Sequence, residues 1–528
     1  MDKRLKPSLI RSAAAVSAAV SLSRLTGMAR EMVMARLFGA GQAYDVFLLG
    51  IRIPNLARNL FAEGALSSAF VPTFTASLKN GRREAQELSD AVATALLVAV
   101  SGLCVIGIIF TPQLVGLLAP GFSAVPGKFA LAVRLTRIMF PFLPLVALAA
   151  HAMGLLNACD RYGVPALASA CFNVVSVLAG LALGYLAGRP LIEAMAWGVL
   201  AGGAAQLVWQ LPVARRHGFG FRPRLDFGHS GVRRIGRLML PALIGSSALQ
   251  INIVVNTNFA STLTDASGHV LNGPVSWLNY AFRFLQLPLG VFGAAIASAA
   301  LPRISRSAAA GDTAEFRCTL AHAIGTSLLL AIPSSAGLAL LGESMIAVVY
   351  QGGRFQASDT RQTAVALACY AAGLAGYALS KILAPAFYAL DDGRTPMWIS
   401  VASVAVNGVA AFALVRWAGL GHAGLALSVS LVALASAAAL FEILRRRLGG
   451  LGGRRLASSA ARILAATAVM SLAVAAAGSR FAPAASRLDH ALRLAVLIPL
   501  GVAVFAAAAR LLGVRELEAL RTGMIHSE

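Results

Sequence analysis

Long stretches of apolar residues, separated by short turns rich in glycine, proline and aspartate, dominate this 528-residue chain. A membrane-spanning helix needs about 20 predominantly apolar residues, and by that measure the pattern predicts about 14 transmembrane helices. The chain is therefore expected to be an all-α polytopic membrane protein. The predicted helices are centred near residues 23, 60, 103, 142, 175, 202, 247, 289, 328, 374, 405, 434, 467 and 501.

The first segment resembles a secretory signal, because the basic residues of 1–11 precede the small apolar residues of 12–22. The apolar pattern continues through Arg24 and Arg30 to Phe38, however, which is too long for the apolar region of a signal peptide. A retained first helix is the better interpretation.

Turn residues recur along the chain at a nearly constant offset of 230 or 231 positions, which indicates an internal repeat of about six helices. Because six is even, both copies would have the same orientation in the membrane. The predicted domains are an N-terminal six-helix lobe (1–229), a C-terminal six-helix lobe (230–455), and an additional helix pair with a cytoplasmic tail (456–528). The matching pairs are Pro72 and Pro302, Gly81 and Gly311, Asp160 and Asp391, Pro165 and Pro396, and Arg215 and Arg445.

Composition excludes a soluble enzyme, because 58% of the residues are hydrophobic and only 13% are charged, about half the charged share of a soluble domain. The net charge of +23 resembles that of a nucleic-acid-binding protein. Well over half of the basic residues lie in alternate loops, however, as is typical of cytoplasmic loops. The charge therefore predicts that both termini are cytoplasmic and that no nucleic acid is bound. Five cysteines without CxxC spacing and scattered histidines indicate no metal site.

Ionisable residues inside apolar segments are functional candidates, because burying them in a membrane is costly. Guanidinium groups form paired hydrogen bonds with phosphate oxygens, so an excess of arginine predicts an anionic, phosphate-bearing substrate. The candidates are Arg24, Arg30 and Glu31 in the first segment, Arg52, Arg58 and Glu63 in the second segment around a break predicted at Pro54, and Arg283 in the second repeat.

Simpler interpretations compete for part of this set. Arg36, Arg52 and Lys381 can extend to lipid headgroups, and Pro54 and Pro288 can bend packed helices without touching a substrate. Asparagines within spans form interhelical hydrogen bonds more often than ligand contacts. Those inside the predicted segments are Asn55, Asn173, Asn252, Asn256 and Asn407.

Four stretches of the chain carry a more specific signal: SLSRLTGMAREMVMARLFGAGQAYDVF, IPNLARNLFAEGALSSAFVP, SWLNYAFRFLQLPLGVFG and SKILAPAFYALDDGRTP. With these motifs, and along about the whole chain, the sequence resembles the MurJ (MviN) family of lipid II flippases. That family belongs to the multidrug/oligosaccharidyl-lipid/polysaccharide exporter superfamily. The resemblance implies two six-helix lobes around a central cavity, followed by two C-terminal helices.

The resemblance also implies a set of site residues. The family's cavity arginines correspond to Arg24, Arg30, Arg58 and Arg283, which are the predicted substrate-binding residues. Positions with a gating or supporting role correspond to Ser23, Glu31, Asp45, Asn55, Glu63 and Ser276.

The sequence departs from the family pattern at several positions. Glu31 stands where aspartate is common, and Phe282 stands where some members have an acid. Some members bind sodium through acids in the second lobe, whereas this chain has Asn252, Asn256 and Asn407 in that neighbourhood. No metal or cofactor is therefore expected, and coupling to the membrane potential or to an ion stays open.

The resemblance implies a transporter, and not an enzyme, that flips lipid II by alternating access across the bacterial cytoplasmic (inner) membrane. Its expected partners are lipid II, membrane lipids and cell-wall synthesis proteins. Three alternatives remain open. One is a flippase for another polyprenyl-pyrophosphate-linked glycan, which carries the same pyrophosphate. Another is a drug or cation antiporter, which the arginines disfavour. The third is a membrane enzyme acting on the same lipid, which would need a catalytic acid or base.

Overall fold

The computed structural model describes residues 6–60, 66–290, 294–481, 484 and 486–517. Within these ranges, the structure describes the backbone but not the side chains of residues 6–17, 56–60, 67–68, 240–249, 294–295 and 297–299. Helices make up nearly all of the described chain, and its β-structure is limited to two isolated bridges. The predicted all-α class is confirmed.

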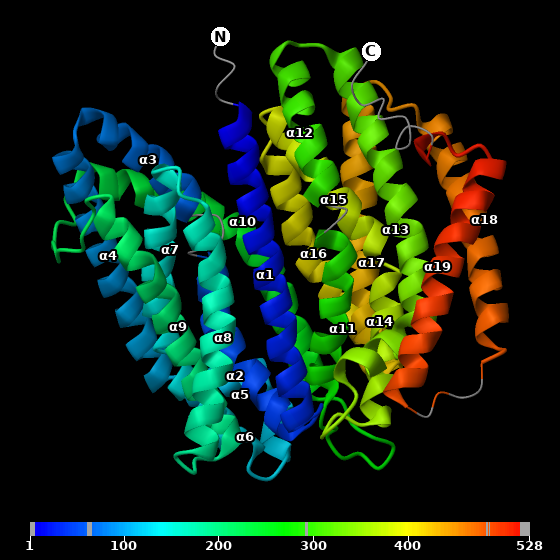
Figure 1. The fold of residues 1–528 in the computed structure, drawn as a ribbon, viewed down its shortest axis with the longest axis horizontal. Coiled ribbons are helices and arrows are strands. Elements are labelled where there is room, and N and C mark those ends of the chain that lie inside the picture. The colour runs from blue at the N-terminus through cyan, green and yellow to red at the C-terminus, as the bar shows by residue number, and fades with distance from the viewer. Residues whose placement is uncertain (1–5, 61–65, 291–293, 482–483, 485, 518–528) are drawn as a thin grey trace. The chain divides into compact units, whose positions relative to one another are not determined.

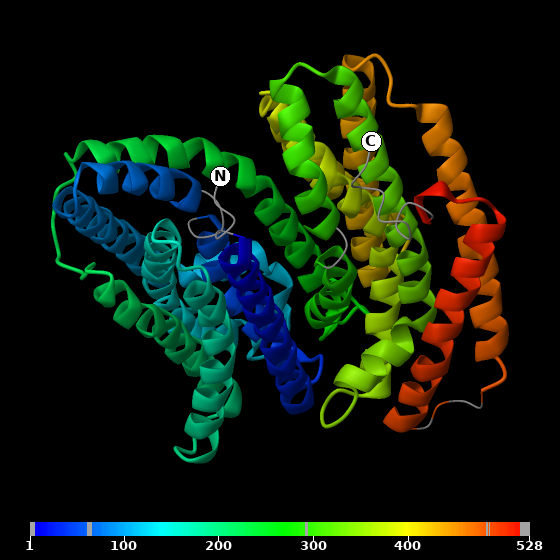
Figure 2. The ribbon, with the colours of Figure 1, turned by 45° about the horizontal axis from the view of Figure 1, so that its top comes forward.

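The chain divides into two compact units, residues 1–272 and 273–528, whose helices are drawn in Figure 1 and Figure 2. The first unit contains α1 (Lys6–Phe38), α2 (Gln42–Leu60), α3 (Leu66–Asn80), α4 (Arg82–Ile109), α5 (Thr111–Leu118), the 3-10 helix η2 (Pro120–Ala124), α6 (Lys128–Met139), α7 (Phe142–Ala158), α8 (Gly163–Tyr185), α9 (Leu191–Arg216) and α10 (Ser230–Ser261). The second unit contains α11 (Pro274–Pro288), α12 (Ala294–Ala309), α13 (Thr313–Tyr350), α14 (Ala357–Ala371), α15 (Leu374–Ala389), α16 (Arg394–Phe412), the π-helical turn η4 (Ala413–Trp417), α17 (Gly421–Arg447), α18 (Gly453–Gly478) and α19 (Arg487–Leu511).

Within the described residues, nine helices are long and apolar enough to cross a membrane. The pair α14 and α15, bent by 44° at a short break, can form a tenth span. This establishes a multi-pass membrane protein but does not reach the predicted 14 spans. The predicted segments outside this count correspond to α1, α2 with α3, α10, and α11 with α12. These helices carry several charges or are shorter than a full span. The predicted spans that are not counted are therefore mainly those that contain the candidate site residues.

The backbone repeats in the same order as the sequence. Asp160 and Asp391 both have φ of 58°, and among the described residues they are the two non-glycine positions with positive φ. Asp160 lies in the turn before α8, and Asp391 lies in the turn before α16. Pro72 and Pro302 likewise lie inside α3 and α12. The same strained turn therefore recurs at matching places in two runs of helices.

The helix α10 belongs to the first compact unit, although the sequence repeat places it at the start of the second copy. A compact unit is defined by packing, whereas a repeat is defined by the order of elements along the chain. The ranges 1–229, 230–455 and 456–528 therefore stay predictions about the repeat.

The helices α8 and α9 pack closely because small residues line their contact. Ser176, Gly180 and Gly184 are spaced four residues apart on α8, and Gly198 and Gly202 continue the pattern on α9. A Cβ atom added at Gly198 would lie 2.2 Å from the carbonyl oxygen of Ser176. Such spacing lets two backbones approach, so that dispersion contacts can replace the hydrophobic effect, which is absent between helices in lipid.

We expect Gly198→Ala to destabilise the protein by about 1–3 kcal/mol, because the added methyl group meets backbone that cannot rotate away. The measurement is the midpoint of thermal unfolding of the purified protein in detergent. Gly102→Ala is the matched control, since Gly102 lies within α4 and has open space around it. Equal midpoints for the two variants would contradict the packing argument.

Candidate functional site

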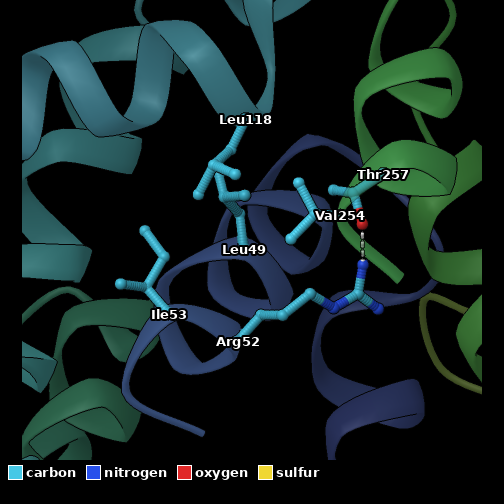
Figure 3. Close-up of a pocket in the computed structure, with 6 residues that line it drawn as sticks. All are labelled: Leu49, Arg52, Ile53, Leu118, Val254 and Thr257. Carbon is cyan, nitrogen blue, oxygen red and sulfur yellow. Dashed lines mark hydrogen bonds between the residues drawn. The ribbon is translucent and has the colours of Figure 1, made fainter. Parts of the chain in front are cut away.

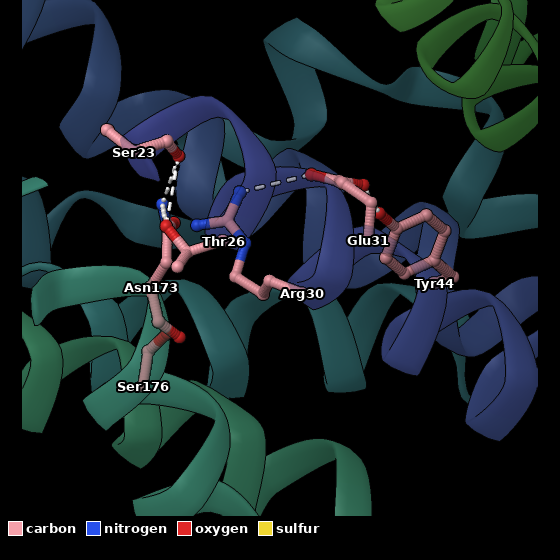
Figure 4. A network of polar contacts seen from close by, with 7 residues as sticks. All are labelled: Ser23, Thr26, Arg30, Glu31, Tyr44, Asn173 and Ser176. Carbon is pink, nitrogen blue, oxygen red and sulfur yellow. Dashed lines mark hydrogen bonds and ion pairs between the residues drawn. The ribbon is translucent and has the colours of Figure 1, made fainter. Parts of the chain in front are cut away.

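A polar network joins α1 and α2 in the first unit (Figure 4). The Arg30 Nη2 atom donates to Glu31 Oε1 at 3.1 Å, and the Tyr44 hydroxyl donates to Glu31 Oε2 at 2.5 Å. Glu31 is buried, and its carboxylate therefore has a partner on each oxygen. The Arg30 guanidinium also lies 5.6 Å from the centre of the Phe172 ring on α8. The arrangement holds an acid and an arginine together in apolar surroundings, where either alone would be costly.

The contact of α1 with α8 is also polar. The Asn173 side chain donates to the Ser23 carbonyl and to Thr26 Oγ1, both at 3.3 Å. The Thr26 hydroxyl itself donates to the Ser23 carbonyl at 3.0 Å, and Ser176 Oγ donates to the Asn173 carbonyl at 3.0 Å. The interhelical hydrogen bond predicted for Asn173 is confirmed. Figure 4 shows the side chains of this seam beside the Arg30 and Glu31 pair.

A second buried charge pair connects α2 with α6. Lys128 Nζ lies 3.0 Å from Asp45 Oδ2 and donates to Asn272 Oδ1 at 2.8 Å. The ammonium also lies 4.3 Å from the centre of the Phe122 ring. Both charged side chains are only 1% exposed. Asp45, predicted as a supporting residue, therefore pairs with Lys128, which was not among the predicted site residues.

Arg52 contacts a neighbouring helix within the first unit. Its Nη1 atom donates to Thr257 Oγ1 on α10, and the two residues border a narrow crevice (Figure 3). The crevice is otherwise lined by Leu49, Ile53, Leu118 and Val254 and has no space for a water molecule. Its apolar lining and this hydrogen bond make it a packing contact between helices.

The break predicted at Pro54 is wrong, because α2 continues through this residue to Leu60. A proline inside a helix removes one backbone hydrogen bond and crowds the carbonyl of the residue four positions earlier. That residue is Gly50, which has no side chain. Membrane helices tolerate such a proline because neighbouring groups can satisfy the freed carbonyl.

The remaining predicted residues are distributed as follows. Arg24 is exposed on α1, and Asn55 is partly buried on α2. The side chain of Arg58 and the whole of Glu63 lie outside the described residues. In the second unit, Ser276 is buried and Arg283 is exposed, both on α11. The structure thus gathers Ser23, Arg30 and Glu31, whereas a common cavity for all four arginines stays a prediction.

Phe282, the residue that replaces an acid of some family members, lies in an aromatic cluster. Its ring centre is 5.4 Å from that of Tyr370 on α14 and 6.4 Å from that of Tyr377 on α15. This environment suits an apolar ring and would penalise an unpaired carboxylate. In the part of the chain that the structure describes, no three His, Cys, Asp or Glu side chains are placed to share a metal ion.

Sequence reasoning missed Tyr44, Lys128 and Thr257 as partners of the charged residues. Tyr44 directly precedes Asp45 in the AYDVF motif, so its position was a usable signal. Lys128 and Thr257 lie 83 and 205 residues from the side chains that they contact, and no local pattern marks them.

The repeated runs of apolar helices and the buried charge clusters define a multi-pass membrane protein with paired charges inside its helical packing. The structure is similar to a solved "Lipid II flippase MurJ, inward closed conformation", with a TM-score of 0.77, 22% identity and coverage of 94% of this chain and 98% of that one. It is also similar to an inward-facing MATE family multidrug transporter of the MOP superfamily, with a TM-score of 0.65, 16% identity and coverage of 81% and 95%. At these identities, the likenesses show the fold.

Sequence comparison is more specific. The family model described as "Lipid II flippase MurJ" matches residues 34–511. The lipid II flippase MurJ of Burkholderia cenocepacia is 37% identical over 445 residues, covering 83% of this chain and 84% of that protein. A probable lipid II flippase MurJ of Vibrio cholerae is 34% identical over 444 residues, covering 82% of each chain. The chain belongs to the lipid II flippase MurJ family, and it is therefore a multi-pass inner-membrane transporter and not an enzyme.

Removing one charge of the Asp45 and Lys128 pair should strand the other in the protein interior. We expect Asp45→Asn or Lys128→Met alone to cost about 3–5 kcal/mol of stability, because a buried charge then lacks its partner. The double variant removes both charges and should be more stable than either single variant. Thermal unfolding in detergent measures this, and a double variant as unstable as the sum of the two singles would show that the pair does not couple.

Proposed function

We propose that this chain flips lipid II, the polyprenyl-pyrophosphate-linked peptidoglycan precursor, from the inner to the outer leaflet by alternating access. Membership of the family supports the substrate and the direction. The proposed substrate contacts are Arg24, Arg30, Arg58 and Arg283, which would bind the pyrophosphate while the polyprenyl tail stays in lipid. Two repeated helical lobes that rock about a substrate site are a recurring transporter design, and this proposal uses it.

The observation that carries the proposal is the setting of Arg30. The side chain is 18% exposed, and among the contacts recorded for the described residues its guanidinium donates one N–H to Glu31. Several donors therefore remain for a phosphate group. The pairing with Glu31 and the neighbouring Phe172 ring hold the guanidinium in one orientation. A hydrogen bond between such an oriented cation and a phosphate is stronger than one in bulk water.

Glu31 gives this site a means of release. In the described state its carboxylate receives hydrogen bonds from both Arg30 and Tyr44. A pyrophosphate would compete with that carboxylate for the guanidinium. A change in the separation of α1 and α2 would shift the balance between the two anions, so substrate affinity would depend on the conformation. Ser23 and Asn173 hold α1 against α8 and would resist unproductive movement of α1.

Transport is proposed to draw on the membrane potential or on an ion, without a sodium site in the second lobe. The asparagines Asn252 and Asn256 on α10 and Asn407 on α16 stand in the neighbourhood where the family resemblance implies acids in sodium-binding members. Asn407 accepts a hydrogen bond from Ser428 at 3.1 Å, which supports a packing role. A charge moved across the membrane gains about 2.3 kcal/mol per 100 mV.

Substitution of the arginines should abolish transport. In cells depleted of their own lipid II flippase, we expect the unmodified chain to restore growth, and Arg24→Ala, Arg30→Ala, Arg58→Ala and Arg283→Ala each to fail, because each removes a pyrophosphate contact. Growth is measured alongside the amount of each variant in the membrane.

Arg36→Ala is the matched control for that experiment, because Arg36 is an exposed arginine in the last turn of the same helix α1. It should restore growth. Full growth with all four substitutions at normal expression would overturn the pyrophosphate site. Flipping of another polyprenyl-pyrophosphate glycan, but not of labelled lipid II, in proteoliposomes would overturn the substrate assignment.

Both termini are proposed to face the cytoplasm, because the basic loops and both ends fall on the same side under the positive-inside rule. Fusions of a fluorescent protein that folds only in the cytoplasm should be bright at either terminus. Fusion into the loop after Tyr185, between α8 and α9, should be dark. A bright signal from that loop, with dark termini, would reverse the proposed orientation.

A further inference from the structure

The segment that connects α9 to α10, residues 217–229, is fastened along the start of α4. The backbone N–H of Arg222 donates to Asp90 Oδ1, and that of Arg224 donates to Thr94 Oγ1, each at 2.9 Å. Asp90 and Thr94 are buried beneath the segment. Two polar side chains of α4 thus hold the backbone of this segment at Arg222 and Arg224.

Further contacts fix the same segment at its beginning. Gln86 Nε2 donates to the Gly220 carbonyl at 2.5 Å. Phe219 is buried and packs against Phe74 of α3, with ring centres 5.3 Å apart. The 217–229 segment is therefore a positioned element of the first unit.

Large apolar side chains of this segment are exposed. Phe221 is 45% exposed, Leu225 is 73% exposed and Phe227 is 55% exposed. Exposed large apolar side chains of this kind are typical of a surface that contacts a membrane or another protein.

The position of the segment along α4 indicates that this surface contacts the membrane. Asp90 is the last charged residue of α4, and residues 92–109 form an uncharged stretch within a helix whose most apolar window has a mean hydropathy of 2.6. Arg222 and Arg224 are bonded at Asp90 and Thr94, on either side of that border. The apolar side chains of the segment are thus level with the edge of the hydrocarbon layer, where aromatic residues are enriched in membrane proteins.

Exposed basic residues lie close to these apolar side chains along the chain. Arg222 is exposed on the segment, and Arg233, Arg234 and Arg237 are exposed in the first turns of α10. The residue Arg224 is already paired with acids of the same unit. Clusters of arginine next to the hydrocarbon edge attract anionic lipid headgroups.

We propose that the 217–229 segment and the start of α10 form a docking surface for anionic phospholipids of the bilayer. The exposed arginines bind the phosphate groups, and Phe221, Leu225 and Phe227 enter the boundary between headgroups and acyl chains. The surface anchors the connection between the two sequence repeats to one leaflet. It uses none of the proposed substrate arginines and does not depend on which lipid is transported.

Thermal stability in the presence of added lipid tests the electrostatic part. Phosphatidylglycerol should raise the unfolding midpoint of the full chain in detergent more than phosphatidylcholine does, because a ligand that binds the folded state stabilises it. Arg222→Gln, Arg233→Gln and Arg234→Gln combined should remove at least half of that difference. The matched control combines Arg189→Gln, Arg354→Gln and Arg361→Gln, which removes the same charge from other exposed positions and should leave the difference intact. Equal losses in the two triple variants would overturn the proposal.

The depth of the 217–229 segment in the bilayer tests whether its apolar side chains enter the membrane. A nitroxide label at Leu225→Cys, in a background without the five native cysteines, should collide more with oxygen than with a water-soluble nickel complex in phosphatidylglycerol nanodiscs. A label at Ser267→Cys, in an exposed loop before Asn272, should show the opposite ratio. A label at position 225 that reports bulk water in these nanodiscs would overturn the proposal and point to a protein partner for the surface.

Discussion

The need to pair charged groups inside an apolar interior governs this structure. Tyr44 and Asp45 are consecutive residues at the start of α2, and a helix turns by about 100° between neighbours. They therefore reach different helices: Tyr44 donates to Glu31 on α1, and Asp45 binds Lys128 on α6. Each contact satisfies a group that could not remain alone at this depth. The beginning of α2 therefore both holds the neighbouring helices α1 and α6 and pairs the buried charges of the site.

The two charge clusters differ in a way that suits different tasks. The Asp45 and Lys128 pair is almost completely enclosed and is completed by Asn272 and Phe122. Such a closed pair resists rearrangement, because opening it exposes two unpaired charges. Arg30 is more accessible and retains donors beyond its bond to Glu31. An incoming anion can exchange with part of the Arg30 network, whereas the Lys128 pair holds the surrounding helices in place.

Packing between helices supplies the rigidity that this arrangement requires. The small residues of α8 and α9 bring the two backbones into contact, and α8 also carries Asn173 and Phe172 to the α1 network. The seam thus fixes the base against which Arg30 is oriented. The 217–229 segment continues from the end of α9 and is fastened to α4, so the chain is constrained where it passes from one sequence repeat to the next.

Hydropathy, loop charge and turn spacing were enough to predict an all-α membrane protein with an internal repeat, because all three can be read from the order of residues along the chain. The motif around Arg30 and Glu31 likewise indicated where charged residues would gather, whereas Arg24 of the same helix is exposed. Local properties could not identify Lys128 as the partner of Asp45 or Thr257 as the partner of Arg52, since these pairs depend on how distant helices are placed together. They also predicted a break at Pro54 that the neighbouring Gly50 makes unnecessary. The sequence by itself determined which residues are costly to bury, and only the tertiary structure decided which groups stabilise them, because that depends on the register between helices.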